Sequence, residues 1–223
     1  DYVLLLNNDT EVNPNFLSLL ESRMDSDKNL AATQPLILNF QNKDTIWNAG
    51  GSFNTFFGLS KTRSKGMLYK PKLKIETFTE WISGCCILVK ISVIKEVGLL
   101  DNHFFAYFED VDWSIRMKSL GYKLGVVPSS IIYHHSSGST KKNNTSNEGN
   151  LSPYAHYLNV RNHIYLINKH TFIFNSIGSW GYQILKITSY SIYFILRGRF
   201  EKFKMVWRGV LDGIKIKNIK NIV

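Results

Sequence analysis

The chain has 223 residues, of which 44% are hydrophobic and 13% aromatic. This is enough for one folded domain with a substantial core and a small appendage. The formal net charge is +10, but nine of the Lys and Arg residues lie between Lys186 and the C-terminus, where only Glu201 and Asp212 oppose them. The rest of the chain is nearly balanced, which excludes a uniformly basic nucleic-acid-binding protein, and we expect no nucleic-acid partner.

The cysteines, Cys85 and Cys86, are adjacent inside an apolar run. Neighbouring residues of a strand face opposite sides, so a disulfide between them is not expected. Their position is typical of small buried side chains in a reducing compartment. The N-terminal residues carry no secretory signal pattern. We therefore expect a cytoplasmic protein.

The first predicted element is a strand. Residues 2–6, YVLLL, form a continuous apolar run, which predicts a strand buried on both faces at the centre of a parallel sheet. The polar residues 7–11, NNDTE, follow at its carboxyl end, where open α/β sheets bind ligands. Two interpretations are open for Asp9: it belongs to a polar turn, or it is a carboxylate ligand for a hard divalent cation.

The next elements are a helix and two strands. Asn13 and Pro14 predict the N-cap and first residue of a helix that runs through Leu17, Leu20 and Met24. Residues 30–38 predict a strand broken by Pro35, and the basic residues 63–74 predict an exposed loop. Residues 83–89 predict a strand in which Gly84 lets another group approach the backbone, followed by a short helix from Ser92 to Gly98.

An acidic helix start is the most informative feature. The aromatic run 104–108, FFAYF, is followed by Glu109, Asp110 and Asp112, and Gly121 ends a predicted helix over 109–120. Its predicted inner face holds Val111, Ile115 and Leu120. The acids either complement the helix dipole or include a carboxylate tuned as a general base at the edge of an apolar pocket.

The C-terminal part alternates strands, a loop and helices. Residues 123–127 and 131–134 predict two short strands that flank Pro128, and 136–150 predict a mobile loop. Ser152 and Pro153 predict the start of a helix that carries Tyr157, Arg161 and Tyr165 at turn spacing. Residues 178–196 are too polar for a membrane span, and 197–216 alternate basic with apolar residues. Such a segment either lies in a membrane interface or packs on the rest of the protein.

Three segments in this order carry a family resemblance: YVLLLNNDTEV, ISGCCILVKISVIKEVGLLDNHFFAYFEDVDWSIRMKSLGYKLGVVPSSIIYHHSSGS and YLNVRNHIYLI. They resemble the second half of a glycosyltransferase family 2 enzyme of the bacterial rhamnosyltransferase-like type. The resemblance implies an A-type glycosyltransferase fold, with a Rossmann-like mixed sheet flanked by helices. It implies that residues 1–170 are the acceptor-side part of the catalytic domain and that 171–223 form basic amphipathic C-terminal helices.

The resembled family has a further βαβ portion, which holds the nucleotide base, before the point that corresponds to Asp1. We therefore expect the chain to be the C-terminal portion of a longer, N-terminally extended enzyme, and the resemblance does not imply that the chain is active by itself. The implied reaction is inverting transfer of a sugar from a nucleotide-diphosphate donor to a hydroxyl of a glycan or glycolipid acceptor. The implied pathway is synthesis of surface polysaccharide or lipopolysaccharide.

The resemblance also implies roles for particular residues. Asp110 is the general base, and Glu109 orients the acceptor or the base. Asp9 and His134 hold Mg²⁺ or Mn²⁺, and Asn7, Asp9 and Arg161 bind the donor. The family's metal motif has a carboxylate two residues before Asp9, where this chain has Asn7, so metal affinity without nucleotide is expected to be weak.

An alternative from another class is a non-catalytic, truncated remnant. Its acidic motifs would be inherited without use, and its basic C-terminus would dock on a membrane or a polyanion. If the C-terminal segment lies in a membrane interface rather than packing on the rest of the protein, we expect residues 178–216 to contact the inner face of the plasma membrane.

Overall fold

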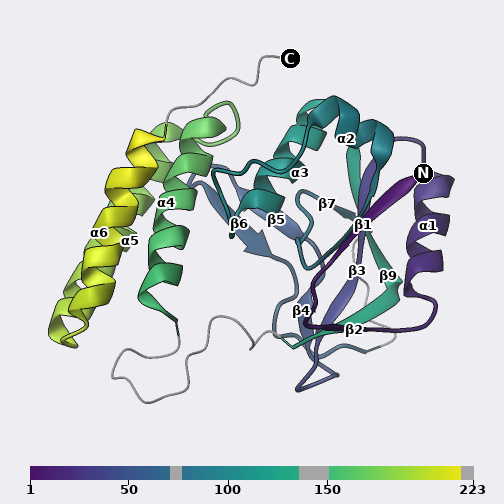
Figure 1. The fold of residues 1–223 in the computed structure, drawn as a ribbon, viewed down its shortest axis with the longest axis horizontal. Coiled ribbons are helices and arrows are strands. Elements are labelled where there is room, and N and C mark those ends of the chain that lie inside the picture. The colour runs from purple at the N-terminus through teal and green to yellow at the C-terminus, as the bar shows by residue number, and fades with distance from the viewer. Residues whose placement is uncertain (71–76, 136–150, 217–223) are drawn as a thin grey trace. The chain divides into compact units, whose positions relative to one another are not determined.

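The computed structural model describes residues 1–70, 77–135 and 151–216 (Figure 1). The end of the predicted exposed loop at 63–74 and the whole of the predicted mobile loop at 136–150 lie outside the described residues. The chain forms two compact units. One comprises Asp1–Phe53, Ser60–His103 and Glu109–Ser136, and the other comprises Asn54–Leu59, Phe104–Phe108 and Ser137–Val223. The functional division predicted between residues 170 and 171 stays a prediction.

The first unit is built on a mixed sheet. Its strand order is β1 (Tyr2–Leu6), β8 (Cys86–Lys90), β3 (Leu30–Asn39), β9 (Lys123–His134) and β2 (Thr10–Val12). Two short strands join it: β4 (Ile46–Asn48) pairs with β3, and β7 (Phe78–Thr79) pairs with β9. Strands β3 and β9 are parallel, whereas β8 is antiparallel to both β1 and β3. The predicted mixed sheet is therefore confirmed.

The position predicted for the first strand is wrong. Strand β1 lies at the end of the order among the described strands and is antiparallel to β8. Its alternate side chains do reach a core on each face: Tyr2 and Leu4 pack in one apolar cluster, and Val3 and Leu5 in the other. Their burial is only partial, because a single neighbour covers the strand edge. An apolar run indicates that both faces of a strand are covered, but it does not indicate how many other strands pair with that strand.

Two prolines that suggested strand breaks lie within continuous strands. Pro35 belongs to β3 and Pro128 to β9, so each of these predictions of a break is wrong. The parallel register pairs Pro35 with Val127 and then Leu36 with Ile131, so it shifts beside both prolines. Proline has no N–H to donate to the ladder, and the shift places both missing donors at one irregularity.

Helices cover both faces of this sheet (Figure 1). Helix α1 (Phe16–Ser26) contributes to one core cluster, and α2 (Ile91–Val97) and α3 (Glu109–Ser119) contribute to the other. Helix α1 begins later than predicted, with Asn15 as its N-cap, because Asn13 and Pro14 lie in a turn in which the Phe16 N–H donates to the Asn13 carbonyl. The short helix α2 is capped by Lys90 rather than Ser92, and it ends at Gly98 as predicted.

The predicted bounds of the acidic helix are close to those observed. Helix α3 begins at Glu109, and Gly121 has a φ of 87° just beyond its end, where glycine is favoured. Val111 and Ile115 are buried as predicted, whereas Leu120 is 50% exposed and does not belong to the inner face. Leu120 follows the last helical residue, so the helical period no longer sets the direction of its side chain.

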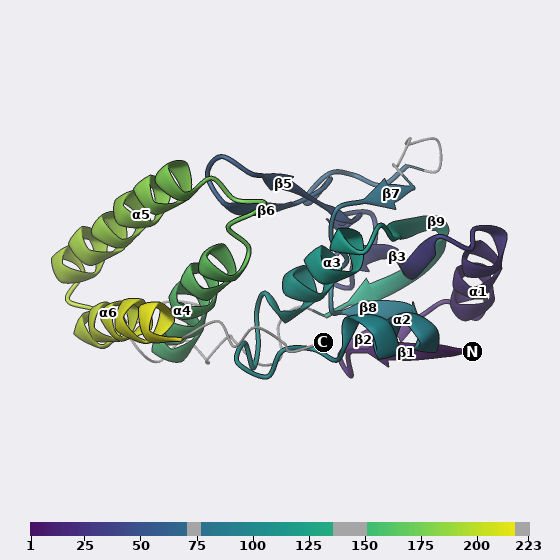
Figure 2. The same ribbon diagram turned by 90° about the horizontal axis from the view of Figure 1, so that it is seen from above.

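The helices described in the second unit follow one another in the chain (Figure 2). They are α4 (Pro153–Lys169), α5 (Ser176–Leu196) and α6 (Phe200–Lys215). Helix α4 starts as predicted, since the Ser152 hydroxyl accepts a hydrogen bond from the Ala155 N–H at 3.1 Å. A two-stranded ribbon of β5 (Gly51–Asn54) and β6 (Leu59–Thr62) completes the described elements. Among the described helices, none combines the length and apolar character needed to cross a bilayer.

Helix α6 approaches α4 through two glycines one turn apart. A Cβ at Gly209 would lie 2.7 Å from the Tyr157 carbonyl oxygen, and one at Gly213 would lie 2.7 Å from the Arg161 carbonyl oxygen. Both distances are shorter than real Cβ contacts, and the atoms that would be met belong to the backbone. The close packing of these helices therefore requires glycine at both positions.

We predict that Gly209→Ala destabilises the chain by about 1–3 kcal/mol, because the added methyl group forces α6 away from α4. Gly181→Ala is the matched control: a Cβ there meets nothing within 4 Å, so the substitution is expected to stabilise α5 by about 0.5–1 kcal/mol. Chemical denaturation of both variants measures the difference. Equal effects of the two substitutions would contradict the packing argument.

Candidate active site

The turn formed by Ser83, Gly84 and Cys85, just before β8, connects two distant acidic motifs. The Asn7 N–H, directly after β1, donates to the Cys85 carbonyl at 3.0 Å. The Gly84 N–H donates to Asp110 Oδ2 at 2.7 Å. A Cβ at Gly84 would lie 3.5 Å from Asp110 and 3.6 Å from Glu109 Oε1, so both acids of α3 lie against this glycine. The close approach predicted at Gly84 is thus observed.

Asp110 accepts two backbone hydrogen bonds. Besides the Gly84 N–H, the Val111 N–H donates to Asp110 Oδ1 at 2.8 Å. Burial raises the pKa of Asp110 above its usual value, and these hydrogen bonds oppose that rise because they favour the charged form. The two bonds also fix the orientation of the carboxylate. Asp110 is therefore a partly desolvated, oriented group of the kind that can accept a proton.

Glu109 is the second acid of the pair. Burial, followed by the charge of Asp110, raises the pKa of Glu109 to about 7. Its Oε2 atom is buried and has no hydrogen-bond partner among the described residues. Because the two carboxyls interact, the pair takes up its protons jointly. Near neutral pH this pair can hold a proton that an ordinary pair of surface carboxylates would have lost.

Asp9 lies beside His134, which is the last residue of β9. Strand β2 pairs with β9 so that Thr10 faces His134, and the His135 N–H donates to the Asp9 carbonyl at 2.9 Å. This register places Asp9 Oδ1 3.2 Å from His134 Nε2. Burial lowers the pKa of His134, and the Asp9 charge opposes that shift. His134 is therefore a neutral imidazole at pH 7, next to a carboxylate.

The two acidic motifs share one environment around Cys85. The pKa of the buried Cys85 thiol is raised by burial first, then by Cys86, and then by the charges of both Asp9 and Asp110. The Cys85 carbonyl accepts the Asn7 N–H, and the adjacent Gly84 N–H donates to Asp110, so both motifs lie against the same turn. Asp9 follows β1, and His134 ends β9, so the group lies at the carboxyl ends of these strands. Open α/β sheets bind ligands at such a position.

Asp9 and His134 supply two of the ligands that a divalent cation needs. No group of three or more His, Cys, Asp or Glu side chains able to hold a metal occurs among the described residues. A carboxylate and an imidazole fit Mn²⁺, and Mg²⁺ is often held by one or two carboxylates with substrate phosphates and water. The Nδ1 atom of His134 is buried without a described partner, and its ring packs against Trp47 at 4.3 Å. The donor set therefore fits a cation that also binds a diphosphate.

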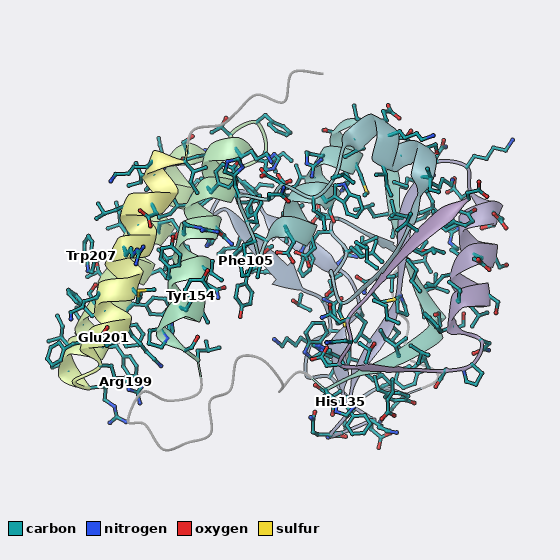
Figure 3. All side chains as sticks on the ribbon, viewed as in Figure 1. Phe105, His135, Tyr154, Arg199, Glu201 and Trp207 are labelled. Carbon is teal, nitrogen blue, oxygen red and sulfur yellow. The ribbon has the colours of Figure 1, made fainter. Side chains whose placement is uncertain are left out.

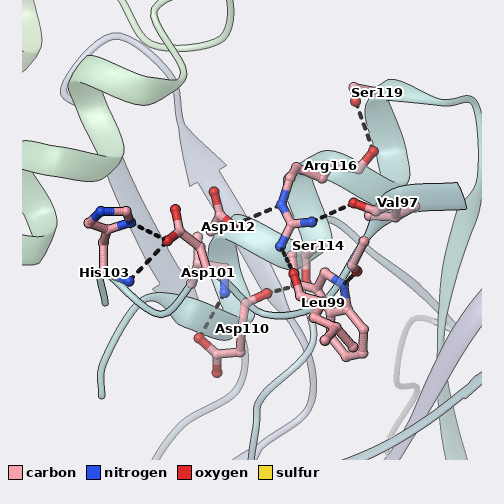
Figure 4. A network of polar contacts seen from close by, with 12 residues as sticks. Val97, Leu99, Asp101, His103, Asp110, Asp112, Ser114, Arg116 and Ser119 are labelled. Atoms are coloured by element: carbon pink, nitrogen blue, oxygen red, sulfur yellow. Dashed lines mark hydrogen bonds and ion pairs between the residues drawn. The ribbon is translucent and has the colours of Figure 1, made fainter. Parts of the chain in front are cut away.

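Asp112 has a structural role in α3, where it pairs with Arg116. It is fully buried, and its Oδ2 accepts from Arg116 Nε at 2.9 Å (Figure 4). The Arg116 guanidinium also donates to the carbonyls of Val97 and Leu99, at 2.6 and 2.8 Å. This network joins α3 to the end of α2. Asp112 therefore stabilises the packing of α3, whereas Glu109 and Asp110 lie against Gly84.

The remaining predicted site residues have other surroundings. Asn7 is exposed, and its side chain has no contact that defines a role. Arg161 belongs to the second unit, where its guanidinium donates to the Phe104 carbonyl at 2.9 Å and to Asn162 Oδ1 at 2.8 Å. Donor binding by Asn7 and Arg161 stays a prediction. The His135 side chain is paired with Glu11, with its Nε2 3.6 Å from Glu11 Oε1.

Asn162 is a buried polar residue that the sequence analysis does not single out. It is fully buried, and its Nδ2 donates to the carbonyls of Phe104, Ala106 and Tyr107 at 2.7–2.9 Å. This holds an aromatic loop in which Phe105, Tyr107 and Phe108 have positive φ angles of 61–72°, a conformation that costs about 1–3 kcal/mol per residue. The sequence carries no signal for this contact, because the three carbonyls belong to a loop that is distant in the chain.

The protein belongs to the α/β class. Its carboxylates gather at the ends of the strands of a mixed sheet, which is where open α/β sheets bind ligands. The sequence model of the "Glycosyl transferase family group 2" matches residues 2–211, and the chain belongs to this family. The predicted family is therefore confirmed.

Two curated relatives are rhamnosyltransferases by name. The N-acetylglucosaminyl-diphospho-decaprenol L-rhamnosyltransferase of Mycobacterium tuberculosis is 34% identical over 91 residues, which is 41% of this chain and 27% of that protein. Rhamnosyltransferase WbbL of Escherichia coli is 30% identical over 78 residues, which is 35% of this chain and 28% of that protein. The matched part of this chain thus spans about a quarter of the length of these relatives.

A solved structure has a similar fold. GalNAc-T7, crystallised with UDP, GalNAc and Mn²⁺, superposes with a TM-score of 0.51 at 18% sequence identity. The likeness covers 75% of this chain and 31% of that one. Together with the mixed sheet and its flanking helices, it confirms the predicted A-type glycosyltransferase fold class.

We predict that Glu109→Gln stabilises the chain above pH 7. The folded-state pKa of about 7 lies above the ordinary value of 4.5, so the wild type loses stability as pH rises between these values. The variant lacks the buried charge and should be more stable by on the order of 2 kcal/mol at pH 8, after allowance for partial solvent screening. The two proteins should be about equally stable below pH 4.5.

Denaturant titrations at several pH values measure this gain. Glu21→Gln, which removes an exposed carboxylate of α1, is the matched control and should not reproduce it. A Glu109→Gln gain that is the same at pH 5 and pH 8 would contradict a buried, proton-holding glutamate.

Proposed function

We propose that this chain is part of the catalytic domain of an inverting glycosyltransferase. It transfers a sugar from a nucleotide-diphosphate donor to a hydroxyl of a glycan or glycolipid acceptor. The observation that carries the proposal is that one turn bonds to both acidic motifs: the Gly84 N–H donates to Asp110, and the Cys85 carbonyl accepts the Asn7 N–H, two residues before Asp9. Family membership and the names of the curated relatives support the same reaction class.

Asp110 is the general base in this proposal. An acceptor hydroxyl is a poor nucleophile until its proton is removed, and a positioned carboxylate contributes roughly 10²–10⁴-fold to the rate. The N–H groups of Gly84 and Val111 hold the Asp110 carboxylate in one orientation. Burial raises its pKa, which strengthens it as a base. Direct attack at the anomeric carbon, opposite the leaving group, inverts the configuration and needs no covalent enzyme intermediate.

Glu109 assists this step as an acceptor-orienting group. Its Oε2 has no partner among the described residues and is adjacent to Asp110 in the chain. An unpaired, buried carboxyl oxygen can accept or donate one hydrogen bond to a substrate hydroxyl, depending on its protonation. With a pKa of about 7 it can do either near neutral pH.

Asp9 and His134 form the donor side. They are the residues that would hold Mg²⁺ or Mn²⁺, which when bound neutralises the charge of the departing diphosphate. Asp9 supplies an oxygen donor and His134 a neutral nitrogen, and the pair is fixed by the β2–β9 register. With two protein ligands among the described residues, cation affinity depends on the nucleotide. Asn7 and Arg161 complete the proposed donor contacts, Arg161 through its guanidinium fork.

The names of the relatives suggest the substrate class. The Mycobacterium tuberculosis relative is named for transfer of L-rhamnose to an N-acetylglucosaminyl-diphospho-decaprenol. By analogy we propose a deoxyhexose or hexose donor and a lipid-linked glycan acceptor, in the assembly of a surface polysaccharide or lipopolysaccharide. The proposed location is the cytoplasm, at the inner face of the plasma membrane, where such an acceptor is reached.

We predict that Asp110→Asn lowers the transfer rate of the full-length protein by about 10²–10⁴-fold, because the amide cannot accept the hydroxyl proton. Donor binding, measured by calorimetry, should be nearly unchanged. Asp44→Asn, which changes an exposed aspartate in the same way, is the control and should retain full activity. Normal turnover by Asp110→Asn would remove this residue from the base role.

We predict that Asp9→Ala weakens metal-dependent nucleotide binding by about ten-fold or more, because it removes the oxygen ligand from a set of two. Titration of the nucleoside diphosphate with and without Mn²⁺ measures the effect. An unchanged metal dependence would refute the assignment of Asp9. Absence of transfer by any full-length form, with intact membrane binding, would favour the non-catalytic docking alternative.

A further inference from the structure

The turn between α5 and α6 exposes large apolar side chains. The exposed fraction of Leu196, the last residue of α5, is 79%, and that of Phe200, the first residue of α6, is 57%. Three more from the last turns of α5 are about half exposed: Ile192, Tyr193 and Ile195. We call these five residues the hairpin tip. Exposed apolar side chains gathered in this way mark a surface that interacts with another protein or with a membrane.

A cavity of about 240 Å³ lies beside the hairpin tip. Its walls combine aromatic rings with cationic side chains and come from α4, α5, α6 and the residues just before α4 and α6: Leu151, His156, Tyr190, Tyr193, Phe194, Arg199 and Lys202. His156, Tyr190 and Phe194 pack ring against ring at 5.0–5.7 Å. The cavity therefore has a rigid aromatic wall, and its volume fits a compact polar group rather than a large ligand.

The cationic side of the cavity is built into the fold. Lys202 is only 2% exposed, and its Nζ lies 5.9 Å from the Phe194 ring centroid. The Arg199 guanidinium lies over the Tyr193 ring at 5.5 Å and donates to the Tyr193 hydroxyl at 3.2 Å. Burial, followed by the charges of Lys202 and Arg199, lowers the pKa of His156 to about 4. The cavity therefore has a wall of cationic side chains beside its aromatic rings.

The start of α6 adds to this field. Arg199 is the N-cap of a 16-residue helix and makes no side-chain capping bond. The N-terminal end of a helix carries a partial positive charge and favours anions. Figure 3 shows Arg199 and Glu201 at this end of the hairpin, with Trp207 farther along α6. Lys202, Arg199 and the helix dipole thus act on the same side of the cavity.

We propose that the hairpin tip docks on an anionic membrane surface, with the phosphate of a lipid headgroup bound in the cavity by Arg199 and Lys202. Apolar residues beside cations are what a membrane interface accepts, since the former enter the acyl boundary and the latter pair with lipid phosphates. A free phosphate or a soluble polyanion would use the cations but leave the five apolar side chains exposed. The combination favours a lipid headgroup as the occupant.

Vesicle flotation of the full chain tests the proposal. Vesicles of phosphatidylcholine, with and without phosphatidylglycerol, are compared at low and high salt. The wild type should float with the anionic vesicles, and high salt should weaken the binding. Circular dichroism verifies that each variant is folded. Absence of binding by the folded wild-type chain would overturn the proposal.

Two matched pairs of variants separate the parts of the site. Arg199→Gln should weaken binding about five-fold, and more than Lys204→Gln, which removes the same charge from an exposed residue paired with Glu201 at 3.0 Å. Phe200→Ser should weaken binding about ten-fold, whereas Phe172→Ser, also at an exposed phenylalanine of this unit, should not. Equal losses within either pair would overturn the assigned role of the cavity or of the tip.

Inorganic phosphate separates the two possible sources of the bound group. Millimolar phosphate should compete only weakly with vesicles, because it gains nothing from the apolar tip. Calorimetric binding of inorganic phosphate together with no binding to anionic vesicles would overturn the membrane assignment and identify a soluble phosphate ligand.

Discussion

The hydrogen bond from the Gly84 N–H to Asp110 is the contact on which the candidate site depends. It ties the first turn of α3 to the turn before β8, and the next residue of that turn, Cys85, accepts the Asn7 N–H that follows β1. One short turn thus connects the two acidic motifs. A Cβ at residue 84 would lie in van der Waals contact with both acids of α3, so this turn packs directly against the acid pair.

Burial and hydrogen bonding act in opposite directions on the acid pair. Desolvation raises the pKa of both carboxyls, whereas the two backbone donors favour the ionised form of Asp110. Glu109 lacks a described partner at Oε2, so desolvation dominates there. The same sequence motif therefore gives one carboxyl that is oriented and one that holds a proton up to about pH 7. Asp112, paired with Arg116, belongs to the scaffold.

Sequence reasoning predicted the local features with strong chemical signals. The family resemblance located the acids, Gly121 marked the end of α3, and Ser152 with Pro153 marked the start of α4. It could not place β1 in the sheet, because an apolar run does not identify its neighbours. Pro35 and Pro128 each suggested a break, and only pairing shows that both lie at one register shift. The three-carbonyl contact of Asn162 had no sequence signal, since it depends on a loop folded by distant residues.

The glycine contacts between α4 and α6 have a mechanical consequence. Backbone carbonyls of α4 face Gly209 and Gly213, and sliding α6 by one turn would bring Met205 to the place of Gly209. A methionine does not fit where a single methyl group already clashes, so the two helices cannot ratchet past each other in that direction. Helices α4 and α6 therefore form one rigid pair, which resists displacement of one helix along the axis of the other in that direction.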